Sequence, residues 1–342
     1  MSKIEITEIT QKTEWQKFVQ SFDFYTFLQS WEWSELQKQE GVEIFRLGGY
    51  VNSELIFTAL VLKIKAKRGT FLLIPHGPMI KDLKHLKVLT NYLNDLGKKE
   101  KADFIRLSPI LLNTKDNSDF LKSLGYKFAP MHVHAETTWL LDLHKTDNEL
   151  LKDMRKTTRY IIHRAEKEGV IVKKDNSAEA IDKFIAMHQK HAKENSYEAF
   201  SGSFIKKLFT VFKEDQISLK FAYFKNFAEA ASIVIYYGHQ AVYYLAATDT
   251  QHPKFSPSYY LQWQSILEAK EKNCFTYNFW GVSPDDNPKH PIYGVSAFKR
   301  GFGGYKYDLL HAHDYPLTNK YFFNYIIETF RRIKRKYYYI KP

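Results

Sequence analysis

The segment 278–305 carries the densest set of residues in this chain that could do chemistry. Five of the 15 glycines of the chain fall in it, and four of these, Gly294, Gly301, Gly303 and Gly304, lie around Lys299. Because glycine adopts positive φ at little cost and leaves room for a ligand, this clustering predicts a backbone that folds tightly past a substrate. Lys299, between the glycines, would place a positive charge that can stabilise an oxyanion if water is excluded. The same residues also fit a helix that ends at a glycine and is followed by a strand, with Lys299 in solvent.

The elements that must position this segment follow from hydrophobic periodicity and turn residues. In the first half we expect, in order, strand 4–9, helices 13–22 and 31–38, strands 42–50, 54–64 and 69–74, helix 83–99, strand 103–107, helix 119–124 and strand 137–143. This order is an antiparallel meander joined to a parallel crossover.

The second half repeats that order. We expect helix 147–167, strand 170–173, helices 177–194 and 203–213, strands 217–225, 229–237 and 241–248, helix 257–272, and strands 275–279 and 305–311. The repetition predicts two similarly folded domains, 1–146 and 147–316. A last helix, 318–336, could pack back on the first domain through Tyr321, Phe322, Tyr325 and Ile326, so that 317–342 completes that domain.

The fold that this order favours is α/β (α+β), with two tandem GNAT-like acyltransferase domains built on mixed sheets. Acetyl-CoA enzymes of the GNAT type hold pyrophosphate on a glycine-rich turn that opens the crossover helix. The corresponding turn of the second half, 252–258, has no glycine, and that of the first half, 77–80, has one. The sequence therefore weighs against acetyl-CoA as the acyl donor.

Composition describes a globular protein with an excess of positive charge. The 342 residues are 44% apolar, with no apolar run near the roughly 20 residues of a membrane-spanning helix. The N-terminus lacks the pattern of an export signal and Cys274 is alone, so we expect a cytoplasmic protein. The net charge of +12 favours an anionic partner, such as nucleic acid, an anionic lipid surface or a phosphorylated small molecule. Basic faces that merely keep the protein dispersed are the alternative.

Metal binding is not expected. The pairs His132 with His134 and His311 with His313 have i,i+2 spacing, which places both rings on one face of a strand. Such pairs are more often surface or core histidines than metal ligands. We predict no metal and no cofactor.

Seven short runs, spread over almost the whole chain, form an ordered set. They are Phe27-Leu28-Gln29-Ser30-Trp31-Glu32-Trp33 through Lys38, Arg159-Tyr160-Ile161-Ile162, Ala165-Glu166-Lys167-Glu168-Gly169-Val170, Tyr243-Tyr244, Pro257-Ser258-Tyr259-Tyr260-Leu261-Gln262-Trp263, Asn278-Phe279-Trp280-Gly281, and the segment from Tyr293-Gly294 to Gly304. In this order they resemble the Fem-type (FemABX) peptidoglycan-bridge aminoacyltransferases. The chain has no coiled-coil heptads, so it is similar to compact members without the long insertion that some carry.

The resemblance implies an activity and its partners. Members of that family have tandem GNAT-like domains and transfer an aminoacyl group from aminoacyl-tRNA to an amine on the stem peptide of a peptidoglycan precursor. The implied partners are therefore aminoacyl-tRNA as donor and a nucleotide- or lipid-linked precursor as acceptor, with peripheral contact to the inner membrane surface as an option. Because the donor is an ester and the nucleophile an amine, the reaction needs positioning more than covalent help.

The resemblance also implies site residues. Lys299, helped by backbone N–H groups around Phe298, would stabilise the tetrahedral oxyanion, a contribution of roughly 3 kcal/mol per donor. Lys38 and Arg159 would meet precursor phosphates, while Tyr243, Tyr259 and Trp263 would line the stem-peptide channel. The remaining implied substrate-binding residues are Trp33, Arg106, Tyr244, Tyr293 and Gly301. The alternatives are a solvated helix end for Lys38 and core packing for the tyrosines and Trp263.

Three positions depart from the family pattern. Ser108 follows strand 103–107 where many relatives have an acidic residue, so a side-chain general base there is doubtful and substrate-assisted deprotonation is favoured. The run 198–204 lacks the arginine that relatives often use for phosphate, which weakens the case for a nucleotide-linked acceptor. Asn278 replaces a frequent aspartate, a change for which we expect a structural effect only.

Two other classes of function remain open. One is a CoA-dependent N-acyltransferase on the same fold, which thermal stabilisation by acetyl-CoA would favour. The other is a non-catalytic RNA-binding or membrane-surface protein that uses the basic helices 147–167 and 318–336. The basic runs alone do not separate these options, because solvated helix faces have the same composition.

Overall fold

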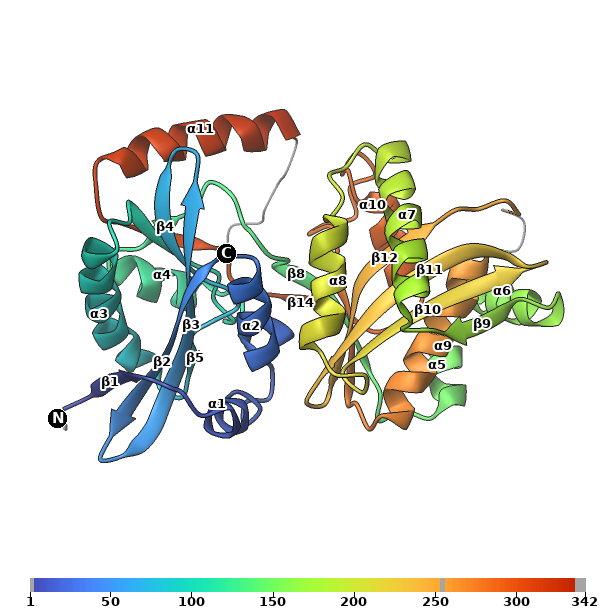
Figure 1. Ribbon diagram of the computed structural model, residues 1–342, viewed down its shortest axis with the longest axis horizontal. Coiled ribbons are helices and arrows are strands. Elements are labelled where there is room, and N and C mark those ends of the chain that lie inside the picture. The colour runs from blue at the N-terminus through green and yellow to red at the C-terminus, as the bar shows by residue number, and fades with distance from the viewer. Residues whose placement is uncertain (1–2, 253–255, 336–342) are drawn as a thin grey trace. The chain divides into compact units, whose positions relative to one another are not determined.

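A computed structural model describes residues 3–252 and 256–335 of the chain (Figure 1). The chain forms two compact units, each built on one mixed β-sheet. Unit 1 takes the residues through Thr137, then Ser283–Tyr293, and the residues from Tyr307 onward. Unit 2 takes Thr138–Val282 and Gly294–Lys306. The domain limits drawn from the sequence, 1–146 with 317–342 and 147–316, follow the repeated element order and stay a prediction.

The sheet of unit 1 has the order β1-β2-β3-β4-β6-β15-β7, with β5 paired to β3. Its strands are β1 (Glu5–Glu8), β2 (Glu43–Val51), β3 (Glu54–Ala66), β4 (Gly69–Ile74), β5 (Met79–Ile80), β6 (Phe104–Leu107), β7 (Lys127–Phe128) and β15 (His313–Pro316). Its helices are α1 (Lys12–Val19), α2 (Trp31–Gln39), α3 (Leu86–Lys99), α4 (Lys115–Ser123) and α11 (Lys320–Arg335). The leucines of α3 at 86, 89, 93 and 96 are buried against β3, β4 and β6, as their spacing of three and four residues predicts.

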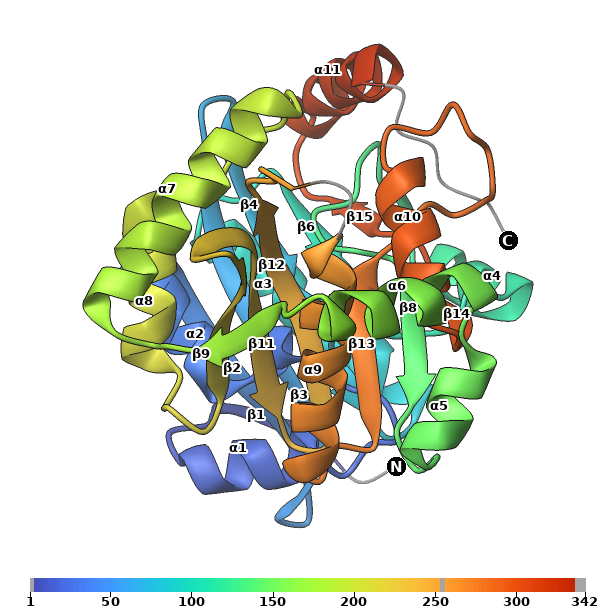
Figure 2. The same ribbon diagram turned by 90° about the vertical axis from the view of Figure 1, so that its right-hand side faces the viewer.

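The sheet of unit 2 has the order β9-β10-β11-β12-β13-β8-β14. Its strands are β8 (Thr137–Asp142), β9 (Ile171–Lys174), β10 (Ile217–Phe224), β11 (Phe227–Tyr237), β12 (Gln240–Thr248), β13 (Thr276–Gly281) and β14 (Tyr305–Asp308). Its helices are α5 (Asp147–Asp153), α6 (Lys156–Lys167), α7 (Ala178–Glu194), α8 (Gly202–Val211), α9 (Pro257–Glu271) and α10 (Tyr293–Arg300). Helix α9 packs on β10 and β11, and α7 packs on β12 (Figure 2).

The two sheets repeat one topology, as the element order predicts. In unit 1 the antiparallel strands β2, β3 and β4 are followed by β6, which runs parallel to β4. In unit 2 the antiparallel strands β10, β11 and β12 are followed by β13, which runs parallel to β12. The mixed α/β fold with two similar halves is therefore confirmed.

The sixth strand of each sheet comes from the other half of the chain. β8 follows the first-half elements in sequence, where we expected it to pair, but it lies antiparallel to β13 in the second sheet. β15 follows the second-half elements but lies antiparallel to β6 and β7 in the first sheet. The two strands hold the same position in the two sheets, next to β13 and β6. The sequence predicts β8 as a strand but not which sheet accepts it, because periodicity carries no information on pairing. It predicts a strand at 305–311 and none at 313–316, where β15 lies.

The basic helix expected at 147–167 is two helices. Met154 has extended backbone angles, φ −67° and ψ 154°, and ends α5 before α6 begins at Lys156. The guanidinium of Arg159 donates to the carbonyls of Leu151, Lys152 and Met154 at 3.1, 2.7 and 2.6 Å. Arg159 therefore satisfies the carbonyl groups that the end of a helix leaves without intrahelical partners.

Helix α11 packs back on unit 1, as predicted, through Tyr321 but not through all the residues named for it. Tyr321 is 1% exposed and its ring lies 5.5 Å from that of Phe104. Phe322 and Ile326, which we expected in this contact, are 48% and 54% exposed. The predicted last residue of this helix, Lys336, lies outside the described residues. Of the helices in the described part of the chain, none combines the length and the apolar character needed to cross a membrane.

Candidate active site

Lys299 lies in the last turn of α10, a helix followed by Gly301 and by the left-handed turn Gly303-Gly304, with φ 82° and 87°. The backbone of this segment is thus a helix that ends at a glycine and is followed by strand β14. This agrees with the second interpretation of the sequence and not with a loop folded around a substrate. The lysine itself contradicts that interpretation, because it is 7% exposed and does not lie in solvent.

The glycines after α10 are required by contacts within unit 2. A Cβ on Gly301 would lie 2.6 Å from Oγ1 of Thr158, and a Cβ on Gly304 would lie 2.2 Å from the carbonyl oxygen of Leu140. We expected these glycines to leave room for a substrate. The structure corrects this: the space beside Gly301 is filled by α6 and the space beside Gly304 by β8.

The ammonium of Lys299 meets a backbone carbonyl that a strand irregularity presents. Its Nζ donates to the carbonyl oxygen of Gly281 at 2.7 Å. The pairing of β13 with β8 shifts register between Asn278 and Gly281, and Trp280 has φ 64°. The side-chain oxygen of Asn278 accepts a hydrogen bond from the N–H of Trp280 at 2.8 Å and holds this bend. A bulge of this kind re-aims the groups that follow it.

No carboxylate of the described residues balances the charge of Lys299. Within residues 3–252 and 256–335, no carboxylate forms an ion pair with it, and the ring of Tyr243 lies 6.0 Å from Nζ. Burial lowers the pKa of Lys299 to about 7. A buried cation that is not paired costs folding free energy, so its presence marks a candidate functional group.

Aromatic side chains surround the α10 end of this site. The ring of Phe298 lies 4.8 Å from that of Tyr259 and 5.2 Å from that of Phe302, in both cases edge to face. Tyr243 and Trp263 belong to the same apolar cluster. The structure therefore brings Lys299, Phe298, Tyr243, Tyr259 and Trp263 together, and core packing explains much of their contact.

Tyr244 lies where the pairing of β12 with β11 shifts register, between the partners of Ile233 and Val234, and it contacts other rings than Tyr243 does. Its ring is 6.0 Å from that of Phe200 and 6.4 Å from that of Trp280. The pairing of β12 with β13 ends at Val242, immediately before Tyr243 and Tyr244. Burial raises the pKa of both tyrosines, which keeps their hydroxyls neutral.

Several residues implied by the resemblance make structural contacts instead. Arg106, 3% exposed, binds both carboxylate oxygens of Asp314 at 2.7 and 2.8 Å and reaches Glu328 at 2.8 Å. These two carboxylates neutralise the charge of Arg106, so its guanidinium has a structural partner on each side. The guanidinium of Arg159 is likewise used by the carbonyls at the end of α5.

The other implied residues contribute less. Trp33 is buried, with its ring edge-to-face on Phe27 at 5.3 Å. Lys38 lies on the surface of α2 and pairs with Glu35 at 3.3 Å, as the solvated-helix alternative expects. Tyr293 is the half-buried first residue of α10. The roles of these residues in substrate binding stay predictions.

Sequence reasoning missed the carbonyl of Gly281 as the partner of Lys299. The run Asn278-Phe279-Trp280-Gly281 was visible, but a backbone oxygen leaves no trace in residue type. Asn278 was expected to have a structural role only, and its bond to the N–H of Trp280 fits that expectation. Ser108 is 3% exposed and its N–H donates to the carbonyl of Ile74.

One group of side chains in the described residues has metal-ligand spacing. Ligand atoms of His132, Glu136 and His311 all lie within 4.8 Å of one another. Nδ1 of His311 already lies within hydrogen-bond distance of a carboxylate oxygen of Glu136, at 2.7 Å, and its Nε2 lies 2.8 Å from the carbonyl oxygen of Ala129. The other oxygen of Glu136 accepts from the N–H of Ala312 at 2.7 Å. Because protein groups occupy these positions, the cluster acts as a hydrogen-bonded link within unit 1.

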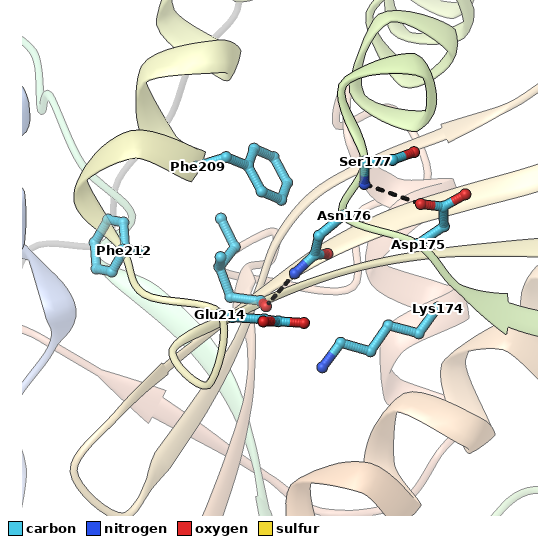
Figure 3. Close-up of a pocket in the computed structure, with 8 residues that line it drawn as sticks. Lys174, Asp175, Asn176, Ser177, Phe209, Phe212 and Glu214 are labelled. Carbon is cyan, nitrogen blue, oxygen red and sulfur yellow. Dashed lines mark hydrogen bonds between the residues drawn. The ribbon is translucent and has the colours of Figure 1, made fainter.

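A pocket at the opposite edge of the second sheet contains none of the implied residues (Figure 3). Its lining includes Lys174, Asn176, Phe209 and Phe212. The amide of Asn176 bridges two strand groups, donating to the carbonyl of Ile217 at 3.1 Å and accepting from the N–H of Leu219 at 2.9 Å. The pocket lies beside β9 and β10. The strands β11 and β12 separate it from β13, which carries Gly281, the partner of Lys299.

The model of the FemAB family matches residues 10–229 and 223–328. The chain belongs to the FemAB family. The Lipid II:glycine glycyltransferase of Staphylococcus epidermidis is 21% identical over 394 aligned positions, which cover 93% of this chain and 93% of that protein. The alignment has more positions than this chain has residues, so the relative contains residues that this FemAB protein lacks.

Solved structures show the same fold. The crystal structure of FemX superposes with a TM-score of 0.82 at 20% identity, over 95% of this chain and all of that one. A tandem GNAT protein from the clavulanic acid biosynthesis pathway gives a TM-score of 0.56 at 9% identity, over 92% and 99% of the two chains. The predicted tandem GNAT-like architecture is thereby confirmed.

Proposed function

We propose that this FemAB-family protein is an aminoacyltransferase that moves an amino acid from aminoacyl-tRNA to an amine of the stem peptide of a peptidoglycan precursor. Family membership and the glycyltransferase relatives support the transferase class. Within this chain, the observation that carries the proposal is the buried Lys299. Its ammonium donates to the carbonyl of Gly281 and pairs with no carboxylate in the part of the chain that the structure describes.

The proposed reaction is aminolysis of an ester. The acceptor amine attacks the aminoacyl carbonyl, and a C–N bond forms while the carbonyl oxygen becomes an oxyanion. Collapse of the intermediate breaks the C–O bond to the tRNA, and the amine proton ends on the released ribose hydroxyl. Lys299, in its charged form, would donate a hydrogen bond to the oxyanion in a site from which water is largely excluded.

The roles of the neighbouring residues follow from their contacts. The N–H of Phe298 lies in the interior of α10, where helical N–H groups bond within the helix, so Phe298 contributes its ring and not its backbone. Tyr243, Tyr259 and Trp263 would provide the apolar wall beside the ammonium. Since Ser108 replaces the acidic residue expected after β6, we assign no side-chain general base.

The test is transfer of radiolabelled amino acids from bulk charged tRNA to nucleotide-linked and lipid-linked precursors. We expect Lys299→Ala to remain folded, as a circular-dichroism melt would check, but to lose about a hundredfold or more in rate. Lys289→Ala, which removes an exposed lysine from the preceding loop, is the matched control and should keep full activity. Unchanged transfer by Lys299→Ala would remove the proposed role, and transfer only from acetyl-CoA would replace the proposed donor.

A further inference from the structure

Helix α11 is attached to unit 1 by one face. Tyr321 and Asn324 are 1% and 7% exposed, and Glu328 binds Arg106 at 2.8 Å. These three residues lie at i, i+3 and i+7, which is one side of a helix. The contact of Tyr321 with Phe104 and the ion pair of Glu328 with Arg106 hold this side of α11 against unit 1.

The outward side of α11 is apolar. Five large side chains on it are 48–69% exposed: Phe322, Phe323, Ile326, Phe330 and Ile333. At about 100° per residue these positions fall within an arc of about 100°, the width of the stripe that a surface helix normally turns toward a protein core. Here the side chains of the stripe are exposed instead of buried in the core of unit 1. Helix α11 is the red helix drawn at the top of Figure 1.

Cations border this stripe. Lys320, Arg331 and Lys334 are exposed residues of α11 itself. The ammonium of Lys127, a residue of β7, lies 5.0 Å from the ring of Phe322. The acidic residue of α11, Glu328, faces inward to Arg106, so no acid of this helix opposes the cations.

We propose that the outer face of α11 docks this protein on an anionic lipid bilayer. A helix with an apolar stripe and cationic borders lies in the plane of a bilayer, with its apolar side chains among the acyl chains and its cations at the headgroups. RNA would engage the cations but leave the apolar stripe in water. A second copy of this chain would cover the stripe but would bring like charges together.

The test uses the full chain and vesicles, without tRNA or precursor, so its outcome is independent of the proposed transferase activity. The protein should co-sediment with vesicles that contain phosphatidylglycerol and only weakly with pure phosphatidylcholine vesicles. Phe323→Ser/Phe330→Ser should weaken binding by about tenfold or more, and Arg331→Gln/Lys334→Gln should weaken it and reduce its salt dependence. Phe227→Ser, which removes a phenylalanine that is 56% exposed in unit 2, is the control and should bind like the unmodified protein.

Three outcomes would overturn the proposal. The unmodified protein does not sediment with either vesicle, or Phe323→Ser/Phe330→Ser binds as well as the unmodified protein. In the third, sedimentation without vesicles shows a dimer that Phe323→Ser/Phe330→Ser converts to a monomer, which would assign the stripe to a second copy. Because all five apolar side chains are exposed, these variants should unfold at the temperature of the unmodified protein, which a circular-dichroism melt checks.

Discussion

At the scale of single residues, Lys299 is buried, and its ammonium donates a hydrogen bond to the carbonyl of Gly281. A lysine in solvent holds its proton to high pH, but the site of Lys299 lowers its pKa to about 7 through burial. Small changes in pH near neutrality therefore change its charge. Both the rate of the proposed reaction and the free energy of unfolding should therefore depend on pH near neutrality.

The charge state predicts the pH dependence of the reaction. If the ammonium stabilises the oxyanion, the rate ratio of the unmodified protein to Lys299→Ala falls as pH rises through about 7, because the ammonium is then lost. Ionisation of the acceptor amine affects both proteins and cancels in the ratio. Single-turnover transfer between about pH 6 and 8 measures it. A ratio that rises with pH would instead make Lys299 a general base.

The same pKa predicts the pH dependence of stability. Above about pH 7 the folded protein has released the Lys299 proton while the unfolded chain still holds it, so the free energy of unfolding rises with pH. Lys299→Met lacks this effect. Between about pH 7.5 and 9.5 the unmodified protein should therefore gain roughly 1 kcal/mol per pH unit relative to the variant, measured by urea unfolding. Parallel pH profiles of the two proteins would contradict the lowered pKa.

At the scale of elements, the connection from α10 to β14 is defined by close backbone contact. Gly304 has φ 87°, and its α-carbon faces the carbonyl of Leu140. Gly294, at the other end of α10, is different, because a Cβ added there would have no neighbouring atom within 4 Å. The two glycines therefore serve different purposes, although the sequence presents them alike.

Substituting alanine for each of the two glycines should change the free energy of unfolding by different amounts. Gly304→Ala should cost about 3 kcal/mol or more of unfolding free energy, because the added carbon meets a carbonyl at 2.2 Å in a left-handed conformation. Gly294→Ala should be neutral or stabilising by up to about 1 kcal/mol, because alanine favours helix. Denaturant unfolding of both variants is the measurement. Equal effects of the two would show that contact with Leu140 is not what requires Gly304.

At the scale of the whole molecule, each half of the sequence supplies one strand to the sheet formed mainly by the other half. β15 supplies Asp314 to Arg106 in the first sheet, and α11 supplies Glu328 to the same guanidinium. β8 lies beside β13 in the second sheet. A fragment that ends between the two sequence halves lacks these partners.

The first half should therefore not fold alone. In a fragment of residues 1–146, β6 would lose its partner β15, and the buried Arg106 would keep no carboxylate. An unpaired buried charge of this kind costs about 3–5 kcal/mol, a large share of a small domain's stability. We expect an aggregated or unfolded fragment by circular dichroism and gel filtration. A soluble monomer with cooperative unfolding would show that the predicted domain limits mark independent folding units.

Much of the architecture could be predicted from the sequence because it depends on local pattern. The leucines of α3 reveal a helix through their spacing, and the apolar runs of β2, β3 and β4 reveal strands through the turn residues between them. The repeated order reveals the twin sheets. The break between α5 and α6 was missed, because Met154 and Arg155 are no helix breakers and the carbonyl contacts of Arg159 exist only after folding.

By itself, the sequence determined the kinds of elements, their repeated order and the family, since hydrophobic spacing and motif order are properties of a linear chain. Tertiary structure alone decided that β8 and β15 change sheets, that Arg106 is neutralised by two carboxylates, and that α11 turns its apolar side outward. The reason is physical. Pairing, desolvation and exposure depend on which distant groups meet, and residues as far apart as Gly281 and Lys299 meet only when the chain has folded.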